Sequence, residues 1–301
     1  MINIYVEPRV VLSWNEFINL KPQYSVALDG YVSDSTKRDP NKMIANFDHH
    51  SIVDRLSTRS TTEQIFMEIN LGLFEIFRQN GQPYMNIFVN DCDEDTVLSI
   101  WLLQNHERVI HHADPLINKL VSCLDKLDCT GGVYPFGDTA MLRKMAWMFQ
   151  PYKEARKQGR LFKMNSEEMK TVIEACLSRI SLYTQGMAQE VEIDSSYKVI
   201  GGGQEWSLVK ESGTSSRMNL FASGLKTIVS VLDSGKYVIM KKSMWVNFPL
   251  EALFNKLNQL EGAIVWGGSN TIGGSLRSIP SKFSPQELES IINDFLKEKN
   301  N

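Results

Sequence analysis

Short apolar runs that lead directly into acidic or imidazole side chains recur four times in the first 114 residues. The runs are YSVAL, MIANF, MNIFV and RVI, and they are followed respectively by Asp29, Asp48-His49-His50, Asp91 to Asp95, and His111 to Asp114. Short runs rich in Val, Ile and Phe are typical of buried strands. The pattern therefore predicts four strands that each end in a polar cluster.

Helical patterns alternate with these runs. Apolar residues at helical spacing, closed by Gly81 and Pro83, predict a helix over Ser60 to Arg78. A mostly buried helix is expected over Thr96 to Gln104, with its N-terminal amides aimed at the acidic cluster before it. This alternation favours an α/β fold with a mostly parallel, doubly wound sheet.

Residues 137 to 190 are amphipathic and helical throughout. The clearest helices are expected at Met141 to Phe149 and at Met169 to Leu182, with a basic stretch from Lys153 to Lys163 between them. We interpret this segment as a helical connector that belongs to a first domain of residues 1–190.

A change of pattern near residue 196 predicts a second, smaller α+β domain over residues 196–301. Its expected elements are four strands, a hairpin turn, a helix, a glycine-rich loop and a capped final helix. They lie at Tyr197–Ile200, Trp206–Val209, Thr227–Leu232, Tyr237–Met240, Asp233-Ser234-Gly235, Pro249–Leu260, Gly267–Gly274 and from Ser284-Pro285 onward.

Composition narrows the classes of partner. The net charge of −3 over 301 residues provides no broad basic surface for long nucleic acid, although it is compatible with a local basic groove. No apolar run approaches the roughly 18 residues of a membrane span, and the N-terminus does not resemble a signal peptide. The four cysteines form no C-x-x-C pair. We therefore expect a cytoplasmic protein with free thiols and no membrane partner.

The strand-end side chains have the chemistry of a metal site. Carboxyl ends of parallel strands meet at one edge of a sheet, so these groups are expected to converge. Mixed carboxylate and imidazole ligands suit manganese or magnesium, and two such ions can activate water and stabilise charge on a phosphoryl oxygen. An exposed acidic turn is the alternative for the run DCDED. The candidate ligands are Asp29, Asp48, His49, Asp91, Asp93 and Asp95.

The Asp48-His49-His50 triplet adds catalytic groups to these ligands. Two adjacent imidazoles behind an aspartate offer one metal ligand and one histidine that contacts phosphate or donates a proton. Arg55 and Arg59 follow closely and can bind phosphate oxygens.

Four motifs together resemble the DHH phosphoesterase superfamily. Asp93-Glu94-Asp95 followed by Ser99 is similar to its D-x-D motif, and Asp91 extends it to the form of the single-strand exonuclease branch. Asp29, nineteen residues before Asp48, and the helix start Ser60-Thr61-Thr62-Glu63 match two further motifs. The order is permuted, because family members ordinarily place the D-x-D motif before the Asp-His-His.

The resemblance implies roles for individual residues. His49 would ligate metal, Asp48 would orient it, and His50 would contact phosphate. Asp29, Asp93, Asp95 and one of two helix-terminal aspartates, Asp125 or Asp128, would complete the two metal shells. Asp128 is favoured because the turn Thr130-Gly131-Gly132 follows it, and a surface turn is the alternative for both. His111 and His112 have no counterpart, and either a structural role or a place in the crevice is open to them.

The glycine-rich segment WGGSNTIGGSLRSI is similar to the substrate-binding motif that ends the DHH-associated domain. It implies that Gly273, Gly274, Ser275 and Arg277 bind substrate, with Ser275 in place of the usual histidine. Trp266 is expected to stack on a base or ring of the ligand.

We therefore expect a two-metal phosphoesterase that acts, in a cleft between its two domains, on a phosphodiester or small nucleotide-like phosphate such as a short oligonucleotide. The permuted order and the missing histidine leave an alternative, a non-catalytic nucleotide- or metal-binding regulatory protein on the same scaffold. Either protein is compatible with an oligomer.

Overall fold

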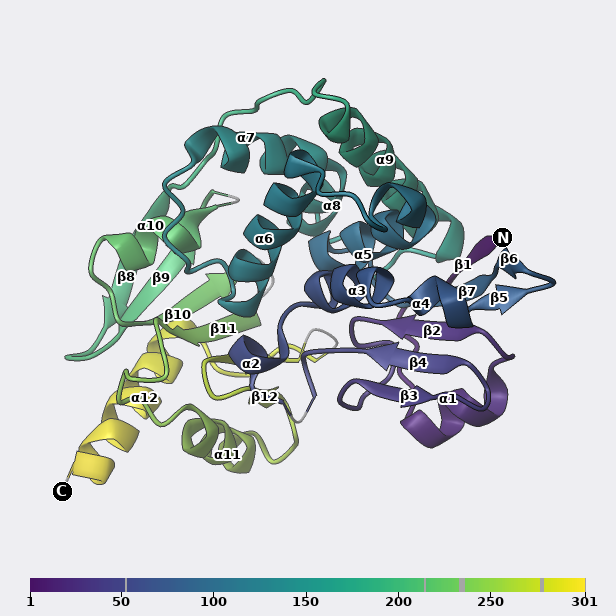
Figure 1. Cartoon of the computed structure of the whole chain (residues 1–301). Coiled ribbons are helices and arrows are strands. Elements are labelled where there is room, and N and C mark those ends of the chain that lie inside the picture. The colour runs from purple at the N-terminus through teal and green to yellow at the C-terminus, as the bar shows by residue number, and fades with distance from the viewer. Residues whose placement is uncertain (52, 214, 233–235, 277–278, 301) are drawn as a thin grey trace. The chain divides into compact units, whose positions relative to one another are not determined.

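The structure, a computed structural model, describes residues 1–51, 53–213, 215–232, 236–276 and 279–300 (Figure 1). The chain is mixed α/β and divides into two compact units, Met1–Glu192 and Ile193–Asn301. The boundary between the two units lies between residues 190 and 196, where the first expected domain ends and the second begins. The expected turn at 233–235 and the expected substrate ligand Arg277 lie outside the described residues.

Within the described residues, a five-stranded sheet organises the first unit, in the order β1-β7-β2-β4-β3. The first four of these strands pair in parallel, and β3 runs antiparallel to β4. The strands are β1 (Ile2–Val6), β7 (Met85–Val89), β2 (Ser25–Leu28), β4 (Ile44–Phe47) and β3 (Lys37–Asp39).

Both faces of this sheet are covered by apolar side chains. Val26 and Leu28 of β2 belong to the large core formed with the helices α3, α5, α6 and α9, whereas Ala27 belongs to a smaller core with Phe17 of α1 (Trp14–Leu20). Successive residues of a strand point to opposite faces, so a strand buried on both sides is mostly apolar along its whole length. Figure 1 shows α1 on the opposite side of the sheet from α3 and α5.

The helical segments of the first unit match the expected pattern in part. The helix expected over Ser60 to Arg78 is interrupted, because Gly72 adopts a left-handed φ of 98° between α3 and α4. The elements are α2 (Arg55–Thr58), α3 (Thr61–Asn70), α4 (Leu73–Ile76), β5 (Arg78–Gln79), β6 (Gln82–Pro83), α5 (Glu94–Gln104), the 3₁₀ helix η1 (His106–Arg108), α6 (Pro115–Cys129), α7 (Thr139–Met148), α8 (Gln150–Lys157) and α9 (Ser166–Thr184).

The prediction of a strand at RVI, residues 108–110, was wrong. Arg108 is the last residue of η1, and the chain continues through a turn to His111. Only Val109 of the three residues is buried. A helical turn can bury one side chain of a three-residue run as well as a strand can. The run was therefore too short to distinguish a strand from a helical turn.

In the described part of the second unit, a six-stranded sheet has the order β12-β13-β11-β10-β9-β8. The glycine-rich segment, expected as a loop, forms the hairpin of β12 and β13 at its edge. The elements are β8 (Tyr197–Gly202), β9 (Ser207–Glu211), α10 (Ser216–Ala222), β10 (Thr227–Leu232), β11 (Lys236–Lys241), α11 (Leu250–Glu261), β12 (Trp266–Gly268), β13 (Ile272–Ser275) and α12 (Pro285–Asn300).

Glycines make this hairpin fit. A Cβ on Gly274 would lie 2.1 Å from the carbonyl oxygen of Tyr237, and one on Gly273 would lie 2.4 Å from that of Gly267. The backbones of neighbouring strands therefore occupy the space that larger residues need. Across the described chain, no helix has the length and apolar character to cross a membrane.

Candidate metal centre

Three adjacent strands end at the candidate centre. Asp29 follows β2, Asp48 follows β4, and the acidic run from Asp91 follows β7 after Asn90. Because β2 lies between β4 and β7 and all three are parallel, their carboxyl ends form one edge. Asp29 has a left-handed φ of 50°, which is an uncommon conformation for a residue with a side chain.

The imidazole of His49 is surrounded by carboxylates. Its Nε2 lies 2.8 Å from Oδ2 of Asp128, 3.5 Å from Oδ2 of Asp95 and 3.6 Å from Oδ1 of Asp29. His49, Asp95 and Asp29 are buried, and Asp128 on the last turn of α6 is partly exposed. Four ligand atoms from four separate segments thus converge on one point.

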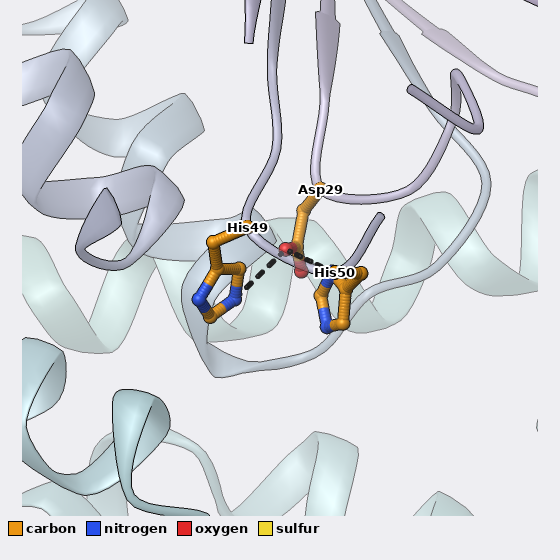
Figure 2. Close-up of side chains that lie close together, drawn as sticks. All are labelled: Asp29, His49 and His50. Atoms are coloured by element: carbon orange, nitrogen blue, oxygen red, sulfur yellow. Dashed lines mark ion pairs between the residues drawn. The ribbon is translucent and has the colours of Figure 1, made fainter. Parts of the chain in front are cut away.

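His50 extends this cluster through Asp29. Its Nδ1 lies 3.3 Å from Oδ1 of Asp29, and Figure 2 shows that carboxylate between the two imidazoles. Two groups of ligand atoms have mutual distances within 4.8 Å: Asp29 with His49 and His50, and His49 with Asp95 and Asp128. His49 belongs to both groups, so the two potential ion positions are neighbours.

Asp48 holds His50, not His49 as expected. Its Oδ1 lies 3.1 Å from Nδ1 of His50, and its Oδ2 accepts the backbone N–H of His50 at 3.0 Å and that of Ser51 at 2.9 Å. The expected orienting contact is absent, since Nδ1 of His49 has no hydrogen-bond partner among the described residues. Burial opposes ionisation of Asp48, but the hydrogen bond and charge of His50 outweigh it and lower the Asp48 pKa.

Threonines that the sequence analysis named only as parts of helix starts bind the buried carboxylates. The backbone N–H groups of Thr61 and Thr62 donate to the two oxygens of Asp95, at 2.8 and 2.7 Å. The hydroxyls of Thr61 and Thr96 donate to Asp29, at 3.1 and 3.2 Å. The first turns of α3 and α5 therefore fix these carboxylates, and helix N-termini favour negative charge. The helix start at Ser60 was the available signal.

The electrostatics of the cluster favour a bound cation. Burial, followed by repulsion from Asp128, raises the pKa of Asp95 to about 6. Burial and then the charges of Asp93 and Asp95 raise the pKa of Asp29 well above its usual range. Burial lowers the His49 pKa, but the charge and hydrogen bond of Asp128 outweigh it, so the pKa is raised. A nearby positive charge would favour the ionised forms of Asp29 and Asp95. Its oxygen and imidazole donors fit a hard divalent cation such as manganese or magnesium.

Arg55 enters the cluster and Arg59 does not. Arg55 Nη2 lies 3.3 Å from both Nε2 of His49 and Oδ2 of Asp128, and its Nε lacks a hydrogen-bond partner among the described residues. Arg59 pairs with Asp125, which also accepts the backbone N–H of Ser60 at 2.9 Å. Asp125 thereby links α6 to the start of α3, while Asp128 belongs to the ligand groups.

Two expected ligands occupy neighbouring positions. Asp93 caps α5 by accepting the backbone N–H of Thr96 at 2.9 Å, and Asp91 accepts that of Cys92 at 2.7 Å. Among the described residues, neither belongs to the two groups of ligand atoms. Asp93 still raises the pKa of Asp29 through its charge.

The fourth predicted cluster lies elsewhere. His111 and His112 are exposed on the turn before α6, and Asp114 caps that helix by accepting the N–H groups of Leu116 and Ile117. None of the three belongs to the ligand groups found in the described chain.

The described residues of the second unit that were expected to contact substrate lie in or beside the edge of its sheet. The hydroxyl of Ser275 accepts the backbone N–H of Tyr237 at 3.0 Å, and Gly273 and Gly274 lie within β13. Trp266 is buried and stacks on Tyr237, with ring centroids 5.7 Å apart. It was expected to stack on a ligand, and its burial rules out that role.

Comparisons with known proteins assign no family. No protein-family model matches the chain, and no curated protein matches it. A solved structure of an uncharacterized protein from Helicobacter pylori G27 aligns with 90% of this chain and 99% of its own, at 11% identity and a TM-score of 0.19. That similarity is too weak to bear on fold or function.

Proposed function

We propose that this chain is a metal-dependent phosphoesterase that hydrolyses a phosphodiester or a small nucleotide-like phosphate with two manganese or magnesium ions. The convergence of Asp29, Asp95 and Asp128 on Nε2 of His49 carries the proposal. The resemblance of the motifs to the DHH superfamily supports it. Permuted order is compatible with the site, because chain order does not decide which strand ends are neighbours. With it we propose that the first unit is a doubly wound sheet.

The ligand groups define the proposed metal positions. His49, Asp95 and Asp128 would hold one ion, and Asp29 would hold a second ion beside His50. Bound divalent cations polarise a phosphoryl oxygen and lower the pKa of water to near neutrality.

The other groups of the chain would handle substrate. Asp48 accepts from Nδ1–H of His50, and in the imidazolium form of His50 the second N–H, on Nε2, would donate its proton to the leaving oxygen and leave a neutral imidazole. The free Nε–H of Arg55, and its charge, suit a phosphate oxygen. The substrate-binding roles expected for Gly273, Gly274 and Ser275 stay predictions.

Hydrolysis of bis(p-nitrophenyl) phosphate with millimolar manganese tests the proposal. His49→Gln should reduce turnover by at least about 100-fold, since even changes around metal ligands cost about 10- to 100-fold. His112→Gln is the matched control, because it makes the same change at an exposed imidazole. No turnover by the unmodified chain, or equal turnover by both variants, would contradict the proposal.

One observation favours the alternative, a non-catalytic binding protein. The guanidinium of Arg55 lies within the ligand set and can itself neutralise Asp128. This alternative predicts no turnover with any divalent metal. It also predicts that the purified chain lacks bound manganese until Arg55→Ala removes the competing charge, which elemental analysis by mass spectrometry would detect.

A further inference from the structure

A tight turn that contains Asp29 follows β2 directly. Asp29 and Gly30 have left-handed φ values of 50° and 83°, and the backbone N–H of Tyr31 donates to the carbonyl of Leu28 at 3.2 Å. Two consecutive residues with positive φ inside such a hydrogen bond are the pattern of a type I′ turn, for which Asp-Gly is a preferred pair. The direction in which the side chain of Asp29 leaves the sheet therefore depends on this turn.

The side chain of Asn90 holds the turn from the neighbouring strand end. Its Nδ2 donates to the carbonyl of Gly30 at 3.0 Å and to the carbonyl of Val10 at 2.7 Å. Gly30 follows β2, Val10 follows β1, and Asn90 follows β7, which lies between those two strands in the sheet. One amide group therefore joins the loops that follow three adjacent strands.

The position of Asn90 is itself fixed. Its carbonyl accepts the backbone N–H of Arg9 at 3.4 Å, and Nη1 of Arg9 donates to the carbonyls of Phe162 at 3.1 Å and Met164 at 2.9 Å. Asn90 is partly buried, and both partners of its side chain are carbonyl oxygens, to which only the nitrogen end of the amide can donate. The orientation of the amide is thus determined by its partners.

The hydrogen bond to Gly30 bears on the candidate metal centre through Asp29. The Asp29 carboxylate lies between two imidazoles, with Oδ1 3.6 Å from Nε2 of His49 and 3.3 Å from Nδ1 of His50 (Figure 2). Positive φ is unfavourable for a residue with a side chain, so a turn without its outside support can relax and carry the carboxylate away from the imidazoles. Threonine hydroxyls hold the carboxylate itself, whereas Asn90 holds the backbone that carries it.

We propose that Asn90 is a positioning residue of the candidate metal centre. It locks the Asp29-Gly30 turn in the conformation that presents the Asp29 carboxylate to the ion beside His50. The inference rests on the proposed function for that ion, whereas the locking of the turn does not need metal. The other ion has a ligand group without Asp29, so its affinity should not depend on Asn90.

Titration with manganese, followed by the electron paramagnetic resonance signal of the free ion, measures both affinities. Asn90→Ala removes two hydrogen bonds and should weaken the binding of one ion about tenfold, while the other ion keeps its affinity. Asn86→Ala is the matched control, because Asn86 lies near the amino end of β7 and also makes two side-chain hydrogen bonds, with Asn3 and Gln23. Unchanged affinities in Asn90→Ala, equal weakening of both ions, or the same loss in the control would overturn the proposal.

Hydrogen exchange of the full chain in EDTA tests the lock without metal. The backbone N–H of Tyr31 should exchange about tenfold faster in Asn90→Ala than in Asn86→Ala, because its hydrogen bond to Leu28 closes the turn. Equal exchange rates in the two variants would overturn the proposal. If the unmodified chain binds no manganese, the proposed function fails, and this comparison still decides whether Asn90 locks the turn.

A second pair of variants acts on the same turn and replaces the first pair if Asn90→Ala does not fold. Gly30→Ala adds a Cβ that meets nothing within 4 Å, so it disturbs only the backbone, whose φ of 83° disfavours a side chain. Gly81→Ala is its matched control, with a φ of 75° and the same free space. Gly30→Ala should weaken the same single ion and speed exchange of Tyr31, and equal results in the two glycine variants would overturn the proposal.

Discussion

Asp128→Asn is expected to abolish most of the stabilisation of the chain by manganese. The substitution keeps the shape of the side chain and one acceptor oxygen but removes the charge closest to Nε2 of His49, at 2.8 Å. Asp128 is partly exposed, so the replacement itself places no new polar group in the core. Its main effect is therefore on the cation that the cluster binds.

The size of the manganese effect follows from the linkage between metal binding and unfolding. A metal at about 100 times its dissociation constant stabilises the folded state by about 2.7 kcal/mol. In a unit of roughly 190 residues this raises the melting temperature by about 5 to 11 °C. If the loss of one of the three carboxylates weakens manganese binding about 100-fold, the remaining stabilisation by manganese is roughly 0.4 kcal/mol. This corresponds to a rise of about 1 °C in melting temperature.

Thermal unfolding with and without millimolar manganese at neutral pH measures this shift. Asp114→Asn is the matched control, because it makes the same chemical change at the other end of α6, about 21 Å away along the helix axis. The control should retain the full manganese shift. The reasoning is refuted if Asp128→Asn retains it too, or if the control loses as much.

Three further predictions follow from the same structure. Without metal, the free energy of unfolding should fall by up to about 3 kcal/mol as the pH rises from about 4 to 6. The reason is that the pKa of Asp95 is about 6 in the folded chain and 3.8 in the unfolded chain, so only the folded state keeps the proton over this range. Denaturant titrations that give the same free energy of unfolding at each pH would contradict this. His50→Gln should reduce turnover about 100-fold and retain the manganese shift in melting temperature, whereas loss of both would indicate a role in metal binding alone. Gly274→Ala should destabilise the chain by about 2 kcal/mol or more, because its Cβ would lie 2.1 Å from the carbonyl oxygen of Tyr237; Gly267→Ala, whose Cβ meets nothing within 4 Å, is the control in the same melting experiment.

The sequence pattern located most of the candidate site because burial on both faces makes central strands mostly apolar along their whole length. β2, β4 and β7 are buried at every position, so the residue at which apolar character stops marks the carboxyl edge of the sheet. The three-residue run RVI carried the same signal more weakly and proved to be a helical turn.

The sequence pattern could not predict the hydrogen bonds of the buried carboxylates. Thr61 binds Asp95 across 34 positions and Asp29 across 32, and only the packing of α3 against the sheet edge brings them together. The choice of His50 over His49 as the partner of Asp48 depends on the local turn, in which Asp48 also accepts the backbone N–H groups of His50 and Ser51.

Exposure of single side chains was equally hard to predict. Trp266 beside glycines resembled a ligand-binding aromatic, yet those glycines let strands approach closely and Trp266 fills the core beneath them. Phe162 in a basic stretch is partly exposed because its neighbours Leu161 and Met164 take the buried positions of the turn. Local composition does not show whether an aromatic ring is exposed, because the packing of its neighbours decides this.

Anomalous diffraction from crystals of the full chain soaked in manganese tests the central claim most directly. We predict a peak bonded to Nε2 of His49 and to oxygens of Asp95 and Asp128, at the distances of about 2.0 to 2.6 Å that divalent cations make with nitrogen and oxygen ligands. Absence of a peak there, with Arg55 still beside His49 and Asp128, would contradict the account.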